Sequence, residues 1–144
     1  MWREGEILVA EDSKLLLQLL HDALTAHGLG TRVVPCRDGE RLIEELLARC
    51  EGQGQVALYL LDIIMPGMSG IDLARRIRAI EQEHDITPTP ILLYSTREQD
   101  AEIEAVVEEC WPARFVRKEA GARADQLAIT VIRILEETRE QKTV

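Results

Sequence analysis

Five polar residues stand just after short apolar runs, where the strands of a buried sheet would end. They are Glu11, Asp12, Asp62, Ser95 and Lys118. Ligands of parallel α/β sheets bind at the carboxyl ends of the strands, so residues in these positions can share one site. Carboxylates held close together repel one another, and a hard divalent ion such as Mg²⁺ relieves that repulsion. Mg²⁺ also favours phosphate oxygens, to which a hydroxyl and an ammonium can add contacts.

Taken singly, most of these residues have an ordinary structural explanation. Glu11 and Asp12 also suit the start of a helix, where the helix dipole favours acids. Ser95 fits a simple turn or capping serine, and Lys118 fits a solvated lysine. Asp62 is different, because an acid that ends an apolar strand needs a compensating partner. The combination therefore favours a single site.

The stretch around Asp62 is the centre of this pattern. The apolar run Val56–Leu61 ends at Asp62, and the stiff turn Met65–Gly67 follows it. Ser69, with Asp72 three residues later, is typical of a helix that starts with a capping box. Asp62 therefore lies where a buried strand ends and the chain turns towards a helix.

Strand-like and helix-like patterns alternate along the rest of the chain. Short apolar and β-branched runs predict five strands, at Glu6–Ala10, Thr31–Val34, Val56–Leu61, Ile91–Tyr94 and Arg114–Arg117. Apolar residues at helical spacing predict a helix after each strand. These helices begin at Ser13, Asp38–Gly39, Ser69, Thr96 and Gly121 or Ala122.

Single residues predict several of the boundaries. Gly28 closes the first helix in the position of a left-handed cap, and Pro35 stops the second strand. Thr96 is the expected N-cap of the fourth helix, with Gln99 three residues later. The first helix is expected to turn one face to the core, formed by Leu16, Leu19, Leu20 and Ala23.

Five strand–helix units predict a parallel sheet with helices on both faces, joined by right-handed crossovers. They are too few for an eight-stranded barrel. We therefore predict one α/β domain over residues 1–144 with the doubly wound, flavodoxin-like (βα)5 fold and strand order 2-1-3-4-5. In that order the first and third strands are neighbours, which puts Glu11 and Asp12 beside Asp62.

Composition restricts the class of function. The net charge of −9 argues against non-specific nucleic-acid binding, which needs a cationic surface. No apolar stretch is long enough to cross a bilayer, and the N-terminus lacks a signal-peptide pattern. The scattered Cys36, Cys50 and Cys110 suit a reducing compartment better than a disulfide framework. We expect a cytoplasmic protein without direct membrane or nucleic-acid contacts.

Four segments of this chain, in the same order, resemble the receiver domain of bacterial two-component response regulators. The most specific is Asp62-Ile63-Ile64-Met65-Pro66-Gly67-Met68-Ser69-Gly70, and the others are Ile7–Asp12, Pro90–Thr96 and Phe115–Lys118. The resemblance covers essentially the whole chain. It implies the same doubly wound fold and a Mg²⁺-dependent phosphorylation site.

The resemblance also implies a role for each matched residue. Asp62 would accept a phosphoryl group from a phosphohistidine. Mg²⁺, or Mn²⁺ in its place, would be held by the carboxylates of Glu11, Asp12 and Asp62 and by the backbone carbonyl of Ile64.

Three further matched residues would respond to phosphorylation. Ser95 would bond the phosphoryl group and Lys118 would pair with it. Phe115 matches an aromatic switch position, whose ring turns inward as Ser95 moves. Phosphoryl transfer mostly needs positioning and charge neutralisation, which a cation, a lysine and a hydroxyl supply.

The implied function is a signalling switch rather than a metabolic enzyme, although such a domain can catalyse its own phosphorylation and dephosphorylation. Its expected partners are a histidine kinase or histidine phosphotransfer protein, and a downstream protein or fused output domain. Phosphorylation would change the surface formed by the fourth helix, the fifth strand and the last helix.

The alternative is a non-phosphorylated pseudo-receiver that serves as a docking or dimerisation module. A phosphatase with an aspartyl nucleophile is disfavoured, because Ile64 stands where such enzymes place a second acid.

The chain departs from the family pattern at two places. Glu119 follows Lys118, where the family usually has proline in a cis peptide. Because a non-proline cis bond costs about 3 kcal/mol, we expect a trans bond and an altered loop. Thr96 replaces a smaller residue beside Ser95. Ile64 and Arg97 occupy positions that tune dephosphorylation in this family.

The last helix is expected to extend over about 121–142. One of its stripes should face the sheet, and it consists of Ala124, Leu127, Ala128, Val131 and Leu135. Ile129 and Ile132 fall outside this stripe. Scattered apolar residues are normal on protein surfaces, but we also consider a partner or homodimer contact at these two positions.

Overall fold

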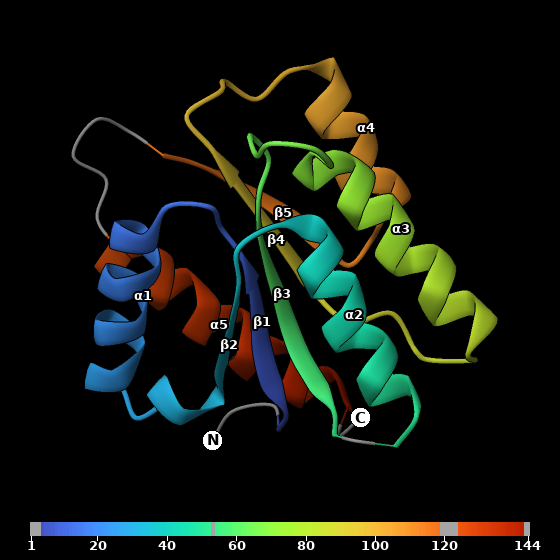
Figure 1. Ribbon diagram of the computed structural model, residues 1–144, viewed down its shortest axis with the longest axis horizontal. Coiled ribbons are helices and arrows are strands. Elements are labelled where there is room, and N and C mark those ends of the chain that lie inside the picture. The colour runs from blue at the N-terminus through green and yellow to red at the C-terminus, as the bar shows by residue number, and fades with distance from the viewer. Residues whose placement is uncertain (1–3, 53, 119–123, 143–144) are drawn as a thin grey trace.

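The computed structural model describes residues 4–52, 54–118 and 124–142. Its five parallel strands form one sheet of order β2-β1-β3-β4-β5, which confirms the predicted fold (Figure 1). The strands are β1 Glu6–Ala10, β2 Val33–Cys36, β3 Val56–Asp62, β4 Ile91–Ser95 and β5 Ala113–Arg117. The helices are α1 Lys14–Ala26, α2 Gly39–Cys50, α3 Gly70–Glu83, α4 Ala101–Glu109 and α5 Ala124–Lys142.

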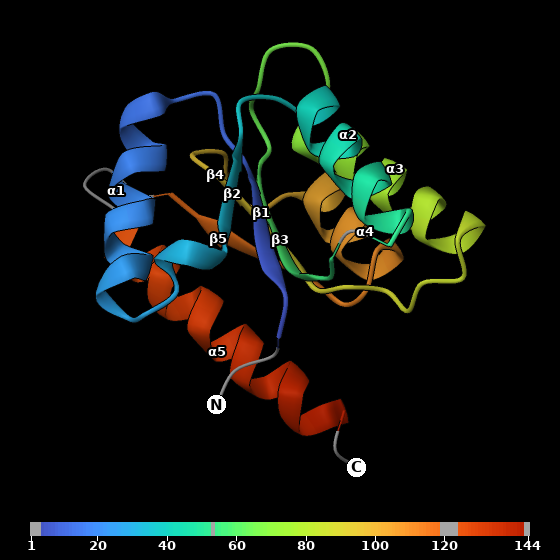
Figure 2. The ribbon, with the colours of Figure 1, turned by 60° about the horizontal axis from the view of Figure 1, so that its bottom comes forward.

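The sheet separates two hydrophobic cores. Figure 2 shows α1 and α5 on one face of the sheet and α2, α3 and α4 on the other. Because side chains alternate along a strand, Leu92 and Tyr94 of β4 join the core of α1 and α5. Ile91 and Leu93 of the same strand join the core on the opposite face. Each central strand is therefore buried on both sides, as the continuous apolar runs predict.

The starts of three helices and the end of one are set by residues that the sequence singles out. The side chains of Ser13, Asp38 and Ser69 accept the backbone N–H of the third following residue, which caps α1, α2 and α3. Gly28 has a φ of +81°, the left-handed conformation expected after the first helix. Local sequence therefore fixes these boundaries.

The predicted limits of the second strand are wrong. Gly30–Arg32 forms a short 3₁₀ turn, and β2 continues through Pro35 to Cys36. Proline is tolerated here because β2 lies at the edge of the sheet, where one side of the strand needs no hydrogen-bond donor.

The predicted cap of the fourth helix is also wrong. Asp100, not Thr96, caps α4, and its Oδ1 accepts the N–H of Ile103 at 3.0 Å. Arg97 pairs with Asp100 at 2.6 Å and with Glu102 at 2.7 Å. These ion pairs join the segment before α4 to its first turn, and Thr96 stays outside the helix.

The predicted inward face of the first helix is confirmed for Leu16, Leu20 and Ala23, which pack in the core of α1 and α5, but it is wrong for Leu19. Leu20 and Leu24 are fully buried, whereas Leu19 is 48% exposed. Leu19 is rotated by about 100° from Leu20 around the helix axis and lies at the border of the buried stripe.

On α5, the predicted stripe of five residues is buried, together with Ile134. Ile129 is 44% exposed, while Ile132 packs partly against the core shared with α1. The predicted helix start at Gly121 or Ala122 lies outside the described residues.

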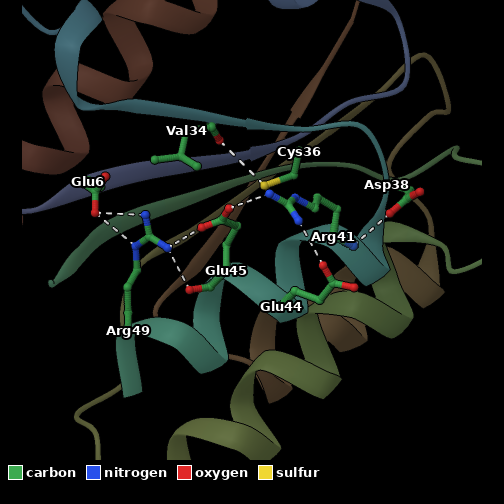
Figure 3. Close-up of polar contacts among 8 residues, drawn as sticks. All are labelled: Glu6, Val34, Cys36, Asp38, Arg41, Glu44, Glu45 and Arg49. Atoms are coloured by element: carbon green, nitrogen blue, oxygen red, sulfur yellow. Dashed lines mark hydrogen bonds and ion pairs between the residues drawn. The ribbon is translucent and has the colours of Figure 1, made fainter. Parts of the chain in front are cut away.

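Helix α2 is joined to β1 by a chain of ion pairs (Figure 3). Arg49 bonds Glu6 at 3.0 Å and Glu45 at 2.7 Å, and Arg41 bonds the other oxygen of Glu45 at 3.1 Å. Glu6 begins β1 and Arg49 lies in the last turn of α2, so this pair joins the two elements at the end of β1 opposite its carboxyl end and supports the fold. Among the described residues, no helix is long and apolar enough to span a bilayer.

Candidate functional site

Three acidic side chains gather at the carboxyl ends of β1 and β3. One carboxylate oxygen from each of Glu11, Asp12 and Asp62 lies within 4.8 Å of the others. The sheet explains this arrangement, because Ala10 of β1 is the register partner of Leu61 of β3. Glu11 and Asp62 are 1% and 5% exposed, so their charges are largely removed from water.

Lys118 supplies a positive charge to both buried acids. Its Nζ lies 3.2 Å from Oδ2 of Asp62 and 3.3 Å from Oε1 of Glu11. The lysine comes directly after β5, and its backbone N–H donates to the carbonyl of Ser95 at 2.6 Å. The predicted trans bond between Lys118 and Glu119 lies outside the described residues.

The two buried acids have opposite pKa shifts. Burial, followed by the neighbouring charge of Glu11, raises the pKa of Asp62 to about 6 from 3.8, although Lys118 and the Ile64 N–H act the other way. Burial alone would raise the pKa of Glu11, but the Ser13 N–H, the Tyr94 hydroxyl and Lys118 together lower it. Asp62 is therefore the acid whose charge is least stabilised by the protein alone.

Tyr94 contacts the site and was not among the residues predicted from the sequence. Its hydroxyl donates to Oε1 of Glu11 at 2.7 Å, and Nζ of Lys118 lies 4.5 Å from the centre of its ring. The signal that could have found it is the two-residue alternation of strands. Asp62 and Tyr94 are register partners and project from the same face of the sheet.

Of the other predicted residues, Ile64 bonds this group through its backbone, whereas no hydrogen bond joins the Ser95 or Phe115 side chain to it. Ser95 is fully buried, and its Oγ accepts the N–H of Arg97 at 3.1 Å. Phe115 is half-buried against the core of α2, α3 and α4. Ile64 is 56% exposed, and its N–H donates to Oδ1 of Asp62 at 3.1 Å.

Helix α3 begins very close to the carboxyl end of β3. A Cβ atom added to Gly70 would lie 2.3 Å from the carbonyl oxygen of Asp62 and 2.8 Å from Cα of Ile63. The N–H of Gly70 also donates to the carbonyl of Ile63 at 3.0 Å. Only glycine allows this approach, which fixes the turn that carries Asp62.

The donor set fits a hard divalent cation. All three side chains offer carboxylate oxygens, which Mg²⁺ prefers, and one of them, Asp12, is open to solvent. Two buried carboxylates beside a single ammonium also leave excess negative charge, which a cation would compensate. The site can therefore hold a metal ion and, with Lys118, an anionic group next to Asp62.

Comparison with known proteins gives a consistent picture. A family model described as "Response regulator receiver domain" matches residues 7–127. The transcriptional regulatory protein CpxR of Escherichia coli (strain K12) is 28% identical over 123 residues, which cover 83% of this chain and 47% of that protein. This chain therefore spans about half the length of that curated relative.

Solved structures share the fold. The chemotaxis protein CheY4 of Vibrio cholerae superposes with a TM-score of 0.69 at 22% identity, covering 91% of this chain and 98% of that one. The response regulator protein TrrA of Thermotoga maritima, solved in complex with Mg(2+)-BeF, superposes with a TM-score of 0.68 at 23% identity, covering 92% and 100%. At these identities the structures show the fold alone.

Proposed function

The chain belongs to the response regulator receiver domain family, and from this premise we propose that it is a signalling switch phosphorylated on Asp62. The observation that carries the proposal is the position of Asp62. Its carboxylate is buried beside two other acids and lies 3.2 Å from the ammonium of Lys118. A nucleophilic carboxylate next to a cation-binding group is the arrangement that phosphoryl transfer requires.

The proposed reaction is transfer from a phosphohistidine of a kinase or phosphotransfer protein. An oxygen of Asp62 forms a bond to phosphorus while the bond between phosphorus and the histidine nitrogen breaks, and the electron pair stays on the imidazole. Lys118 pairs with the incoming phosphoryl oxygens. The site holds the nucleophile in place, because Oδ1 of Asp62 is fixed by the N–H of Ile64.

The carboxylates of Glu11, Asp12 and Asp62 and the carbonyl of Ile64 would hold Mg²⁺, for which Mn²⁺ can substitute. The ion would supply positive charge that neutralises the negative oxygens around Asp62. The close approach of the three carboxylates supports this assignment.

The proposed response to phosphorylation is carried by Ser95 and Phe115. A phosphoryl group adds about −1.5 to −2 charges and three acceptor oxygens. The Ser95 hydroxyl, which now accepts the Arg97 N–H, would reorient and donate to one of these oxygens. Phe115 would then turn into the space left by Ser95 and change the surface of α4, β5 and α5. A change from 1:99 to 99:1 between the two states requires about 5.5 kcal/mol.

The proposed output is recognition of this changed surface by a downstream protein or a fused output domain. The CpxR relative is named as a transcriptional regulatory protein, and this chain matches about half of it.

The proposal is tested by incubation with MgCl₂ and acetyl phosphate, followed by intact-mass measurement. We expect one phosphoryl adduct on the unmodified protein and none on Asp62→Asn. Asp72→Asn is the matched control, because Asp72 is an exposed acid in the first turn of α3, and it should form the adduct normally. No adduct, or an equal adduct on Asp62→Asn, would leave the docking-module alternative.

A further inference from the structure

Tyr94 is the one described aromatic residue that contacts both charged partners of Asp62. Its hydroxyl donates to Glu11 at 2.7 Å, and its ring lies under the ammonium of Lys118 at 4.5 Å. The side chain is fully buried in β4, so its position is fixed by the core of α1 and α5. A rigid residue therefore contacts both the carboxylate of Glu11 and the ammonium of Lys118.

The hydroxyl of Tyr94 completes the hydrogen bonding of Glu11. One oxygen of Glu11 accepts the Ser13 N–H at 2.9 Å, and the other accepts from Tyr94 and from Lys118. The Ser13 and Tyr94 donors come from α1's cap and from β4, so they fix the carboxylate from two elements. Hydrogen bonds to a metal-binding carboxylate hold it in the orientation that the metal needs.

The ring of Tyr94 has a separate effect on Lys118. A cation within about 6 Å of an aromatic face is attracted to it, and the attraction is stronger when both groups are shielded from water. The Lys118 side chain is only 20% exposed. The ring therefore holds the ammonium between Glu11 and Asp62 and limits its other orientations.

We propose that Tyr94 is a positioning residue for this site: its hydroxyl orients Glu11 for Mg²⁺, and its ring orients Lys118 for the phosphoryl group. The inference rests on the proposed function of Asp62. It adds a determinant of metal affinity that lies outside the acids and the lysine.

The chain contains a matched control. Tyr59 is also buried in a central strand, at 1% exposed, but it faces the core of α2, α3 and α4. No hydrogen bond joins its hydroxyl to any other described residue. Tyr59→Phe and Tyr94→Phe thus remove the same atom at the same depth, and only Tyr94→Phe alters the site.

The first experiment measures binding of MgCl₂ alone by isothermal titration calorimetry. Tyr94→Phe should raise the dissociation constant about tenfold or more, as the loss of partners to metal ligands does. Tyr59→Phe should leave it unchanged. Thermal unfolding in EDTA verifies that both variants fold. Equal Mg²⁺ affinity in folded Tyr94→Phe and the unmodified protein would overturn the role of the hydroxyl.

A double-mutant cycle tests whether Tyr94 acts through Glu11. In a Glu11→Gln background, Tyr94→Phe should change Mg²⁺ affinity by less than about twofold, because the carboxylate that it orients is gone. An undiminished tenfold effect in that background would overturn the proposed route. Neither titration contains a phosphodonor, so the result does not depend on whether Asp62 is phosphorylated.

Phosphorylation by acetyl phosphate separates the two contributions. Tyr94→Phe should need more Mg²⁺ for half-maximal rate but keep its maximal rate, whereas Tyr94→Met, which lacks an aromatic face, should also lose maximal rate severalfold. Equal maximal rates for the two variants would overturn the role of the ring. If Tyr94→Phe weakens Mg²⁺ binding as expected but the unmodified protein forms no adduct on Asp62, the result would contradict the proposed function and leave the role of Tyr94 intact.

Discussion

At the scale of single residues, Asp62 is held in an environment that opposes its own charge. Burial and the adjacent carboxylate of Glu11 raise its pKa, and Lys118 compensates only in part. The folded chain in the absence of metal is therefore less stable than it would be with a neutral group here. Such local instability is typical of functional sites, because the missing compensation comes from the ligand.

The raised pKa predicts a pH-dependent effect of Asp62→Asn. The folded pKa of about 6 exceeds the ordinary 3.8, so the acid's contribution to stability is fully present below pH 3.8 and is lost as pH rises through 6. Asparagine has nearly the same shape and carries no charge. In EDTA at pH 7.5 we expect Asp62→Asn to be more stable than the unmodified protein by about 1–3 kcal/mol.

Urea unfolding in EDTA measures this difference. The gain should shrink towards zero near pH 4, where Asp62 in the folded protein is protonated. Asp72→Asn, at an exposed acid, should show no comparable gain. A variant Asp62→Asn that is less stable than the unmodified protein at pH 7.5 would contradict the sign of this argument.

At the scale of the elements, the sequence predicts features that depend on neighbouring residues in the chain. It misses several that depend on contacts with the rest of the fold. The apolar runs predict the central strands, and Ser13, Asp38 and Ser69 predict three helix starts. Both features depend on residues that are close together in the sequence. The sheet order followed from alternation and handedness, and it brought the acids of β1 and β3 to one edge.

Three misjudged features depend on neighbours that a local pattern does not contain. Pro35 stays within β2 because that strand is at the edge of the sheet. Asp100 caps α4 with the support of Arg97. Tyr94 reaches Glu11 across the sheet, a contact between residues 83 positions apart in sequence. The sequence thus predicts the site residues at the strand ends. The structure adds Tyr94, which precedes the last residue of β4.

The corrected cap of α4 leads to a prediction for this element. Asp100→Ala removes the acceptor of the Ile103 N–H and one partner of Arg97, and should lower stability by about 1 kcal/mol. Thr96→Ala should have little effect on stability, because Thr96 lies before the cap. Chemical unfolding of both variants compares them directly. A larger loss for Thr96→Ala would restore the cap first expected there.

At the scale of the whole molecule, the helices on both faces of the sheet leave some large apolar side chains exposed. Helix α5 carries Ile129, 44% exposed, beside a helix α1 whose Leu15 and Leu19 are 71% and 48% exposed. Helices α1 and α5 contact each other and cover the same face of the sheet. Ile132 is less suited to a partner contact than expected, because it packs partly against the core.

Self-association of the whole chain is therefore best tested at Ile129 alone. If α5 forms a two-fold contact, Ile129→Gln removes apolar area from both copies, and a loss of about 1 kcal/mol per copy weakens the dimer roughly 30-fold. Leu47→Gln is the matched control, since Leu47 is 39% exposed on α2, across the sheet from α5. Sedimentation velocity over a range of concentrations measures both variants.

Two results would contradict a homodimer contact at α5. One is concentration-dependent association that Ile129→Gln leaves unchanged, and the other is an unmodified protein that stays monomeric at every concentration. Because Ile129 lies outside both hydrophobic cores, its substitution should leave the thermal stability of the monomer nearly unchanged, so a change in association reports the surface rather than the fold.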